Sequence, residues 1–345
     1  MIDPHVHLRD WKQKDKESIS HGLMVAKEAG IDRVFDMPNT NPPLIDRESI
    51  LSRLSLGTEE AEKIGSSYSV YAGLTSDDEQ IRAMVALHSE LFPLVVGLKM
   101  FLSHSTGNMG ITEIESQRHV IRTLAVCGYD GVLAVHAEKE SLNDMSLEDP
   151  LDYSSHSSAR PAISETESVR DIIRFCEEEK FPGHLHICHI STADAVKEVV
   201  KAKERGLSIS MGSTPHHALL NSDDARDAER GLKMNPPLRA ESDRLFIYES
   251  LKNGVIDNVE SDHAPHTLDD KRKGASGIPC FSGMLLLYHK LKEDGVSRER
   301  LLDLFGRNVI KIYGLRDEEI RLPVDSEELF LKVSDAYPIR PFKWS

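Results

Sequence analysis

The chain has 345 residues, and its 42 Lys and Arg against 57 Asp and Glu give a formal net charge of −15. This acidic balance disfavours nucleic-acid binding, which needs a basic patch, and no apolar run reaches the roughly 18 residues of a membrane span. Because no secretory signal opens the chain and 39% of its residues are hydrophobic, we expect a globular, cytoplasmic protein that contacts neither nucleic acid nor membrane.

Short runs rich in Val, Ile and Leu alternate along the chain with longer amphipathic stretches. The runs predicted as strands are 2–6, 32–35, 68–74, 94–101, 132–136, 184–190, 207–211 and 255–259. The stretches predicted as helices are 16–29, 47–64, 79–88, 113–127, 165–179 and 192–204. Gly30, Gly128 and Gly206 follow three of these helices, at the position where glycine relieves left-handed strain.

The repeated order of strand and helix is typical of a parallel sheet. About eight such units fit an α/β fold of the (β/α)8 TIM-barrel type better than an open doubly wound sheet. No GxGxxG or GxxxxGK[ST] segment opens a helix, which weakens the dinucleotide-binding and P-loop alternatives. We assign residues 1–314 to the barrel and residues 315–345 to a short C-terminal appendage, with the remnant of a small β domain as one interpretation of it.

Sixteen histidines are the unusual feature of the composition, and several follow predicted strands. His5 and His7 are two residues apart at the end of the first strand, so the period of two points both rings to one side. The other candidates at strand ends are His136, His186, His189 and Asp262. In a barrel all of these residues reach the C-terminal rim, where catalytic groups collect. Since imidazole and carboxylate are common metal ligands, the pattern predicts a metal site.

Lys99 lies within the apolar strand predicted over residues 94–101, where a charged amine is costly to bury. One interpretation is a side chain that reaches solvent at the strand end. The other starts from burial, which favours the neutral amine. A neutral lysine amine can react with CO₂ to give an anionic carbamate, whose two oxygens can bridge two metal ions.

Seven segments resemble the motifs of the dihydroorotase family, in the order that the family has them. They are DPHVHLRD at 3–10, MPNTNPP at 37–43, GLKM at 97–100, VHAE at 135–138, HICHIS at 186–191, NPPL at 235–238 and SDHAPHT at 261–267. The HxH pair and the late aspartate indicate only the amidohydrolase superfamily, which also holds hydantoinases, allantoinases and ureases. The HLRD, MPNT and DHAPHT segments are the parts typical of dihydroorotases.

The resemblance implies a zinc enzyme that interconverts N-carbamoyl-L-aspartate and L-dihydroorotate in de novo pyrimidine biosynthesis. It implies two zinc ions per chain, bridged by a carboxylated Lys99 and a hydroxide. The implied ligands of one ion are His5, His7, Lys99 and Asp262, and those of the other are Lys99, His136 and His189. Asp262 would also be the catalytic base and acid.

Further roles follow from the same resemblance. Arg9, Asn39 and His266 would bind the substrate carboxylate, and Asn235 would lie near the pyrimidine ring. The loop at 103–110 would close over the substrate, with Thr106 as a contact. A homodimer or another enzyme of the pyrimidine pathway would be the protein partner.

His189 is preferred to His186 as a ligand because it precedes Ile-Ser-Thr, as in the family. In an ideal strand His186 faces the side opposite to His189, so we expect a structural role for it. One departure from the family is that the chain starts at the HxH strand, which many relatives precede with further residues. Another is GIPCFS at 277–282, where relatives have GIPGFE.

Two other functions stay open at this point. A related cyclic amidase that acts on hydantoins or allantoin would not need Arg9 and Asn39 for a carboxylate. A non-catalytic barrel that scaffolds a pyrimidine-pathway partner would be expected to have lost metal ligands, whereas all six implied ligands are present in this sequence.

Overall fold

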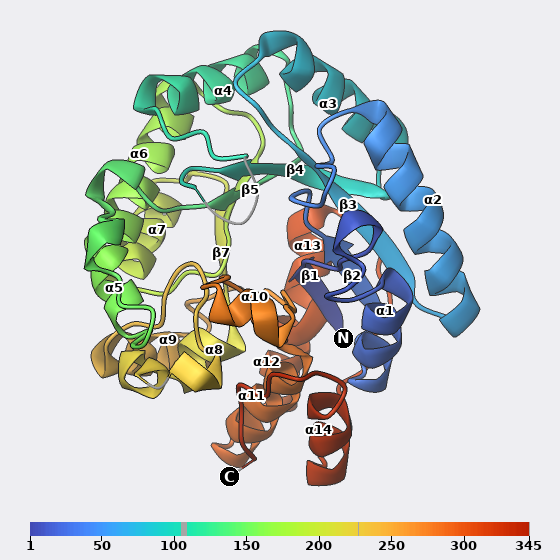
Figure 1. Ribbon diagram of the computed structural model, residues 1–345. Helices are drawn as coiled ribbons and strands as arrows, with labels where there is room; N and C mark the ends of the chain where they lie inside the picture. The colour runs from blue at the N-terminus through green and yellow to red at the C-terminus, as the bar shows by residue number, and fades with distance from the viewer. Residues whose placement is uncertain (105–108, 227, 345) are drawn as a thin grey trace.

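The computed structural model describes residues 1–104, 109–226 and 228–344, and eight parallel strands follow one another in chain order around a barrel (Figure 1). The strands are β1 (Ile2–Val6), β2 (Arg33–Asp36), β3 (Ser67–Gly73), β4 (Val95–Phe101), β5 (Val132–His136), β6 (His184–Ile187), β7 (Ile209–Ser213) and β8 (Asn258–Val259). A bridge between Val6 and His263 joins the end of the ring to its beginning. The predicted (β/α)8 barrel is confirmed.

Helices surround the strands in Figure 1. They are α1 (Ile19–Glu28), α2 (Arg47–Ile64), α3 (Asp78–Leu91), α4 (Ile114–Val126), α5 (Ser155–Ala159), α6 (Ala162–Glu178), α7 (Ala193–Glu204), α8 (Pro215–Leu219), α9 (Glu241–Lys252), α10 (Leu268–Arg272), α11 (Phe281–Glu293), α12 (Arg298–Leu302), α13 (Asn308–Tyr313) and α14 (Glu327–Ser334). The six predicted helices are confirmed, with ends that differ by at most three residues. Within the described ranges, no helix combines the length and apolar character needed to cross a bilayer.

The strand predictions are correct in position and wrong in some lengths. β6 ends at Ile187 instead of residue 190, because His189 has a left-handed backbone with φ of 38°, which does not continue a strand. β8 has two residues instead of the predicted five. The glycines predicted to follow helices have φ values of 80° at Gly30, 65° at Gly128 and 90° at Gly206, so these predictions are confirmed.

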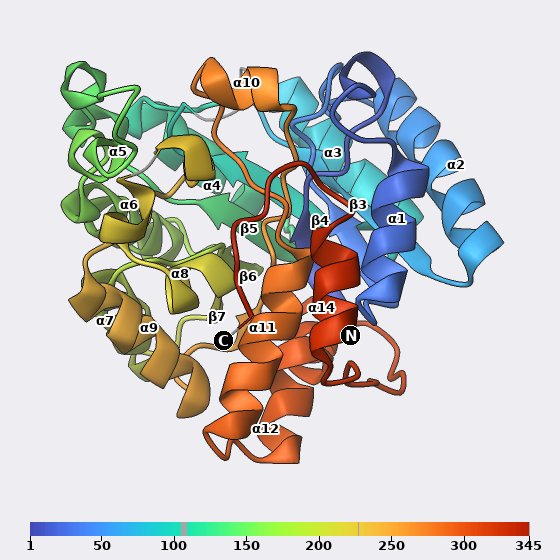
Figure 2. The same ribbon diagram turned by 60° about the horizontal axis from the view of Figure 1, so that its bottom comes forward.

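Residues 315–344 contain helix α14 and no strand. Apolar residues alternate weakly over 319–333, and part of this stretch is the helix, which buries Phe330 and Val333. Figures 1 and 2 both show α14 alongside α1 and α11, on the outside of the barrel. The division after residue 314 and the origin of the appendage stay predictions.

Aromatic side chains fill the N-terminal half of the barrel. The rings of Phe35, Tyr71 and Tyr313 lie 5.1 to 6.3 Å apart, centre to centre, in edge-to-face arrangements. Tyr313 belongs to α13, and the hydroxyl of Tyr71 donates a hydrogen bond of 2.9 Å to the carbonyl oxygen of Pro4. These rings therefore fill the lower part of the barrel, and the space that they leave open lies toward the C-terminal ends of the strands.

The buried carboxylate of Glu17 ties the C-terminal tail to the barrel. The hydroxyl of Tyr337 donates to Oε1 of Glu17 at 2.7 Å, and Nε2 of His263 lies 3.3 Å from the same oxygen. Burial alone would raise the pKa of Glu17. The charge of His263 and hydrogen bonds from His21, His263 and Tyr337 outweigh burial and lower this pKa from 4.5 to about 2.

We expect the free energy of unfolding of Glu17→Gln to fall less steeply with decreasing pH than that of the wild type. Because the folded-state pKa of Glu17 lies below 4.5, the folded protein binds fewer protons than the unfolded chain between the two values. The stabilisation from this ionised group, on the order of 3 kcal/mol, is complete above pH 4.5 and is lost as the pH falls toward 2. Urea unfolding of the wild type and the variant between about pH 3 and pH 7 measures this difference.

The exposed Glu62 provides the matched control. Glu62→Gln removes the same charge from the surface and is expected to leave the slope of stability against pH as in the wild type. If both variants change the slope equally, the buried contacts of Glu17 are not the cause.

Candidate active site

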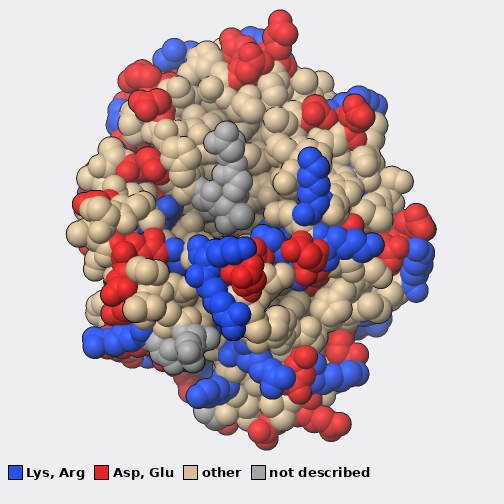
Figure 3. All heavy atoms as spheres, in the orientation of Figure 1, with Lys and Arg blue, Asp and Glu red and all other residues tan. Residues whose placement is uncertain are grey.

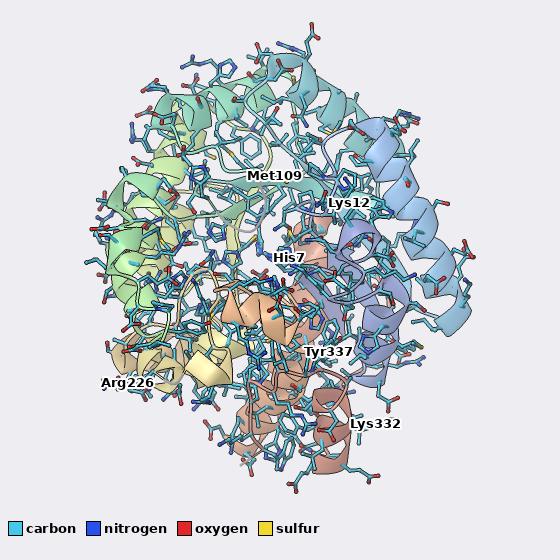
Figure 4. The ribbon with its side chains drawn as sticks, viewed as in Figure 1. His7, Lys12, Met109, Arg226, Lys332 and Tyr337 are labelled. Atoms are coloured by element: carbon cyan, nitrogen blue, oxygen red, sulfur yellow. The ribbon has the colours of Figure 1, made fainter. Side chains whose placement is uncertain are left out.

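A pocket opens at the C-terminal ends of the strands. Its lining residues are His5, His7, Arg9, Asn39, Phe101, His136, His189, Asn235, Asp262, Ala264, Ser276 and Gly277. Figure 4 shows His7 near the centre of the ring of helices. Lys99 and His266, which are also predicted at the site, are not among these lining residues. Eight of the predicted site residues are thus brought together in one pocket.

Three donor atoms, from β1, from the residue that follows it and from the segment after β8, converge in the pocket. Nε2 of His5 lies 3.3 Å from Nε2 of His7 and 3.4 Å from Oδ1 of Asp262. Nε2 of His7 lies 2.9 Å from the same oxygen. Two ligands held 2.0–2.1 Å from a tetrahedral zinc ion lie about 3.3 Å apart, so the type and spacing of these donors fit a divalent metal ion.

His136, at the end of β5, and His189, in the turn after β6, form a second pair of donors. Nδ1 of His136 lies 3.1 Å from Nε2 of His189, which again fits two ligands of one ion. The rings of His5 and His189 lie 5.0 Å apart, centre to centre. The two sets of donors are therefore neighbours on the wall of one pocket.

Oxygen atoms behind these rings determine where the imidazole protons lie. Nδ1 of His7 is 2.7 Å from Oδ1 of Asn39, and Nε2 of His136 is 2.8 Å from Oε2 of Glu138. A ring nitrogen that donates to such an oxygen leaves the lone pair of the other nitrogen free to bind a metal. Asn39, predicted as a substrate contact, is therefore also the partner of a predicted ligand.

Glu138 is in turn held by a buried arginine that the sequence analysis missed. Nη2 of Arg160, which lies between α5 and α6, donates to Oε2 of Glu138 at 2.6 Å. Burial would raise the pKa of Glu138, but the charge of Arg160 and the contact with His136 hold this pKa well below its usual value. The signal in the sequence was weak, because Arg160 has no spacing that relates it to Glu138.

Lys99 lies on the interior side of β4, whereas its neighbours Leu98 and Met100 pack against the helices. The side chain is fully buried, and Nζ lies 3.1 Å from Sγ of Cys188. No carboxylate within residues 1–104, 109–226 and 228–344 forms an ion pair with this amine.

A positively charged wall lies beside the candidate metal ligands. Arg9 is buried, and its Nε donates to the carbonyl oxygen of Pro265 at 3.2 Å. Nε2 of His266 lies 3.0 Å from the carbonyl oxygen of Ser276, and its Nδ1 lies 3.3 Å from Nζ of Lys16. Burial, and then the charges of Arg9 and Lys16, lower the pKa of His266 to about 2. The ring is therefore neutral, and the cation facing the pocket is Arg9.

Asn235 also lines the pocket. Its Oδ1 accepts a hydrogen bond of 2.8 Å from Nε2 of His156, and Nδ1 of His156 lies 3.6 Å from Oε2 of Glu148. Glu148 is paired with Lys233. The amide of Asn235 is thus oriented by three side chains that no motif in the sequence indicated.

His186 and His189 both face the barrel interior, so the expectation that they face opposite sides is wrong. β6 ends before His189, whose left-handed backbone turns its ring inward. Nε2 of His186 lies 3.2 Å from Oε2 of Glu260, a buried carboxylate. Burial would raise the pKa of Glu260, but hydrogen bonding to His186 and His5 lowers it. His186 is part of a polar network below the pocket.

The rim of the pocket carries charges of both signs. Figure 3 shows Lys and Arg interspersed with Asp and Glu on this face, over α10. Of the loop predicted to close over the substrate, Thr106 lies outside the described residues. The end of this loop returns to β4 through a bridge between Gly110 and Phe101.

No protein-family model matches the chain. Curated proteins named dihydroorotase are similar to the chain in sequence. That of Pyrococcus furiosus is 31% identical over 343 residues, which cover 99% of this chain and 72% of the relative. That of Pyrococcus abyssi is 35% identical over 350 residues, which cover 96% of this chain and 76% of the relative. Among solved structures, L-hydantoinase (dihydropyrimidinase) from Arthrobacter aurescens has a TM-score of 0.80 at 23% identity, covering 94% of this chain and 73% of that one. This last likeness shows the shared fold.

We expect Glu138→Ala to destabilise the fold strongly. The substitution leaves Arg160 buried without its partner, and removing one partner of a buried pair typically costs about 3–5 kcal/mol. Urea unfolding in the presence of a chelator measures this loss without a contribution from bound metal. Glu90→Ala, which breaks the exposed pair with Arg47, is the control and should leave the unfolding free energy nearly unchanged. Equal effects of the two variants would contradict the prediction.

Proposed function

Because the chain belongs to the dihydroorotase family, whose members are cyclic amidohydrolases, we propose that it interconverts N-carbamoyl-L-aspartate and L-dihydroorotate with two bound zinc ions. The observation that carries this proposal is the convergence of His5, His7 and Asp262 at the spacing of tetrahedral ligands. The buried guanidinium of Arg9 lines the same pocket, within reach of an acidic substrate.

The residues fit two adjacent metal ions. One ion is assigned to His5, His7 and Asp262, and the other to His136 and His189. Lys99, buried beside the pocket, would be a further ligand if its amine were carboxylated. When bound, the two ions supply Lewis acidity, which polarises the substrate carbonyl and lowers the pKa of the attacking water.

Asp262 moves the proton in both directions of the reaction. Burial would raise its pKa, but the hydrogen bond with His7 and the charges of His5, His7 and His216 hold this pKa below the usual range, so the group starts as a base. In ring opening, Asp262 takes a proton from the attacking water as the new C–O bond forms, and it gives that proton to the ring nitrogen as the C–N bond breaks. In ring closure the nitrogen gives its proton to Asp262, which returns it to the leaving oxygen.

Arg9 is assigned to the substrate carboxylate, because its planar guanidinium can donate two parallel hydrogen bonds to a carboxylate. Charge-assisted bonds of this kind contribute roughly 1.5–3 kcal/mol each. Asn39 and His266 are assigned to the same carboxylate, since one lies on the pocket wall and the other lies against Arg9. Asn235, held by His156, is assigned to the polar edge of the pyrimidine ring.

We expect the purified protein to hold about two zinc ions per chain and to open L-dihydroorotate in preference to hydantoin and allantoin. Elemental analysis of protein prepared without chelator gives the metal content, and absorbance assays give turnover of the three rings. Asp262→Asn is the control for catalysis, because it keeps the shape of the side chain and removes its basicity. Turnover of hydantoin or allantoin alone would overturn the substrate assignment, and turnover by Asp262→Asn at the wild-type rate would overturn the role of Asp262.

Arg9→Ala is expected to raise KM for L-dihydroorotate roughly 10- to 100-fold, the equivalent of one charge-assisted carboxylate contact. The zinc content should stay at the wild-type value, because no metal ligand is altered. Steady-state kinetics and elemental analysis of the same preparation test both parts. Arg272→Ala, which removes an exposed arginine of α10, is the matched control and should leave KM unchanged. An unchanged KM in Arg9→Ala would favour a ring without a carboxylate as the substrate.

A further inference from the structure

We propose that Glu260 is a positioning residue that orients two metal ligands, His5 and His189, from beneath the pocket. The inference rests on the proposed function, because it assumes that these two histidines bind metal. Glu260 directly follows β8 and is 1% exposed. It is not among the residues that line the pocket, so its role is to hold other side chains rather than to touch the substrate.

The first contact of Glu260 is with the backbone of a ligand. Oε1 accepts a hydrogen bond from the backbone N–H of His189. The φ angle of His189 is 38°, in the left-handed region that residues other than glycine rarely adopt. Strain of this kind persists where the surroundings fix it, and it is concentrated at functional sites. The bond from Glu260 stabilises this conformation and so keeps Nε2 of His189 3.1 Å from Nδ1 of His136.

The second contact is with the ring of His5. Oε1 of Glu260 lies 3.5 Å from Nδ1 of His5. This negative oxygen favours the tautomer that carries the proton on Nδ1. The lone pair of Nε2 is then directed to the point where His7 and Asp262 converge. A carboxylate behind a ligating histidine fixes both the tautomer and the ring orientation.

The third contact connects Glu260 to a chain of groups deeper in the barrel. Oγ of Ser210 lies between two histidine rings, 2.7 Å from Nε2 of His184 and 2.8 Å from Nδ1 of His186. The other nitrogen of His186, Nε2, lies 3.2 Å from Oε2 of Glu260. One consistent order satisfies all three contacts: His184 donates to Ser210, Ser210 to His186, and His186 to Glu260. Both oxygens of Glu260 therefore have hydrogen-bond partners.

The neighbouring strand leaves room for this carboxylate. A Cβ atom at Gly212, in β7, would lie 2.5 Å from Oε2 of Glu260 and 3.0 Å from Nδ2 of Asn258. Any larger residue at this position would therefore displace the side chain of Glu260. The absence of a side chain at Gly212 is an independent sign that β6, β7 and β8 are built around this carboxylate.

Two substitutions separate the position of the carboxylate from its charge. Glu260→Gln keeps the length of the side chain and removes the charge, whereas Glu260→Asp keeps the charge and shortens the reach by one methylene. We expect each to weaken zinc binding about 10- to 100-fold, the usual effect of losing a partner of a metal ligand. Competition with a chromophoric chelator measures the affinity of the apo-protein for zinc. The visible spectrum of the cobalt-substituted protein reports the ligand geometry and should change in both variants.

Glu165→Gln is the matched control. Glu165 is also a buried carboxylate, and it accepts a backbone N–H from Ser191, two residues after His189, but it contacts none of the assigned ligands. This variant should bind zinc within about threefold of the wild type. If it weakens zinc binding as much as the Glu260 variants do, the effect is a general loss of buried charge and the proposal is wrong.

The remaining outcomes are equally decisive. Wild-type zinc affinity and an unchanged cobalt spectrum in Glu260→Asp would reduce the role of Glu260 to its charge and overturn the positioning role. If Glu260→Gln fails to fold, which its far-ultraviolet circular dichroism would reveal, Glu260→Asp alone decides the question. A wild-type protein that binds no zinc and opens no dihydroorotate would contradict the proposed function. Two zinc ions in the wild type with unchanged affinity in the Glu260 variants would contradict only the present inference.

Discussion

The pocket depends on one physical constraint: a buried imidazole must give its proton to a fixed acceptor before its other nitrogen can face an ion. Asn39 provides this acceptor for His7, and Glu138 provides it for His136. The acceptors are themselves buried and, in the case of Glu138, paired with an arginine. The geometry of the donor atoms therefore depends on residues that would never touch a metal, and the pocket is organised several layers deep.

Much of the architecture could be predicted from local patterns. Runs of apolar residues and the helices between them indicated the barrel, because a strand buried on both faces has a distinctive composition. The period of two in His5 and His7 correctly placed both rings on one wall. Residues at strand ends could be expected to meet, since parallel strands present their C-terminal ends to the same rim.

The partners of these residues could not be predicted in the same way. Arg160 and Glu138 are 22 residues apart in the sequence, and His156 and Asn235 are 79 residues apart. No periodicity relates the members of either pair. The inward direction of His186 was missed for a different reason. It depends on where β6 stops, which is decided by the left-handed backbone of His189 rather than by the composition of the strand. Long-range satisfaction of buried polar groups is thus the part of the site that only the fold reveals.

The closure of the ring between its first and last strands also determines when the site can exist during synthesis. His7 and Asp262 lie 2.9 Å apart in space but 255 residues apart in sequence. Contacts of such wide separation form late in folding, because a long loop must close before they contribute. A ribosome releases β1 long before it has made β8, so the first histidines emerge as isolated donors. The complete set of candidate metal ligands is therefore assembled only when the barrel closes.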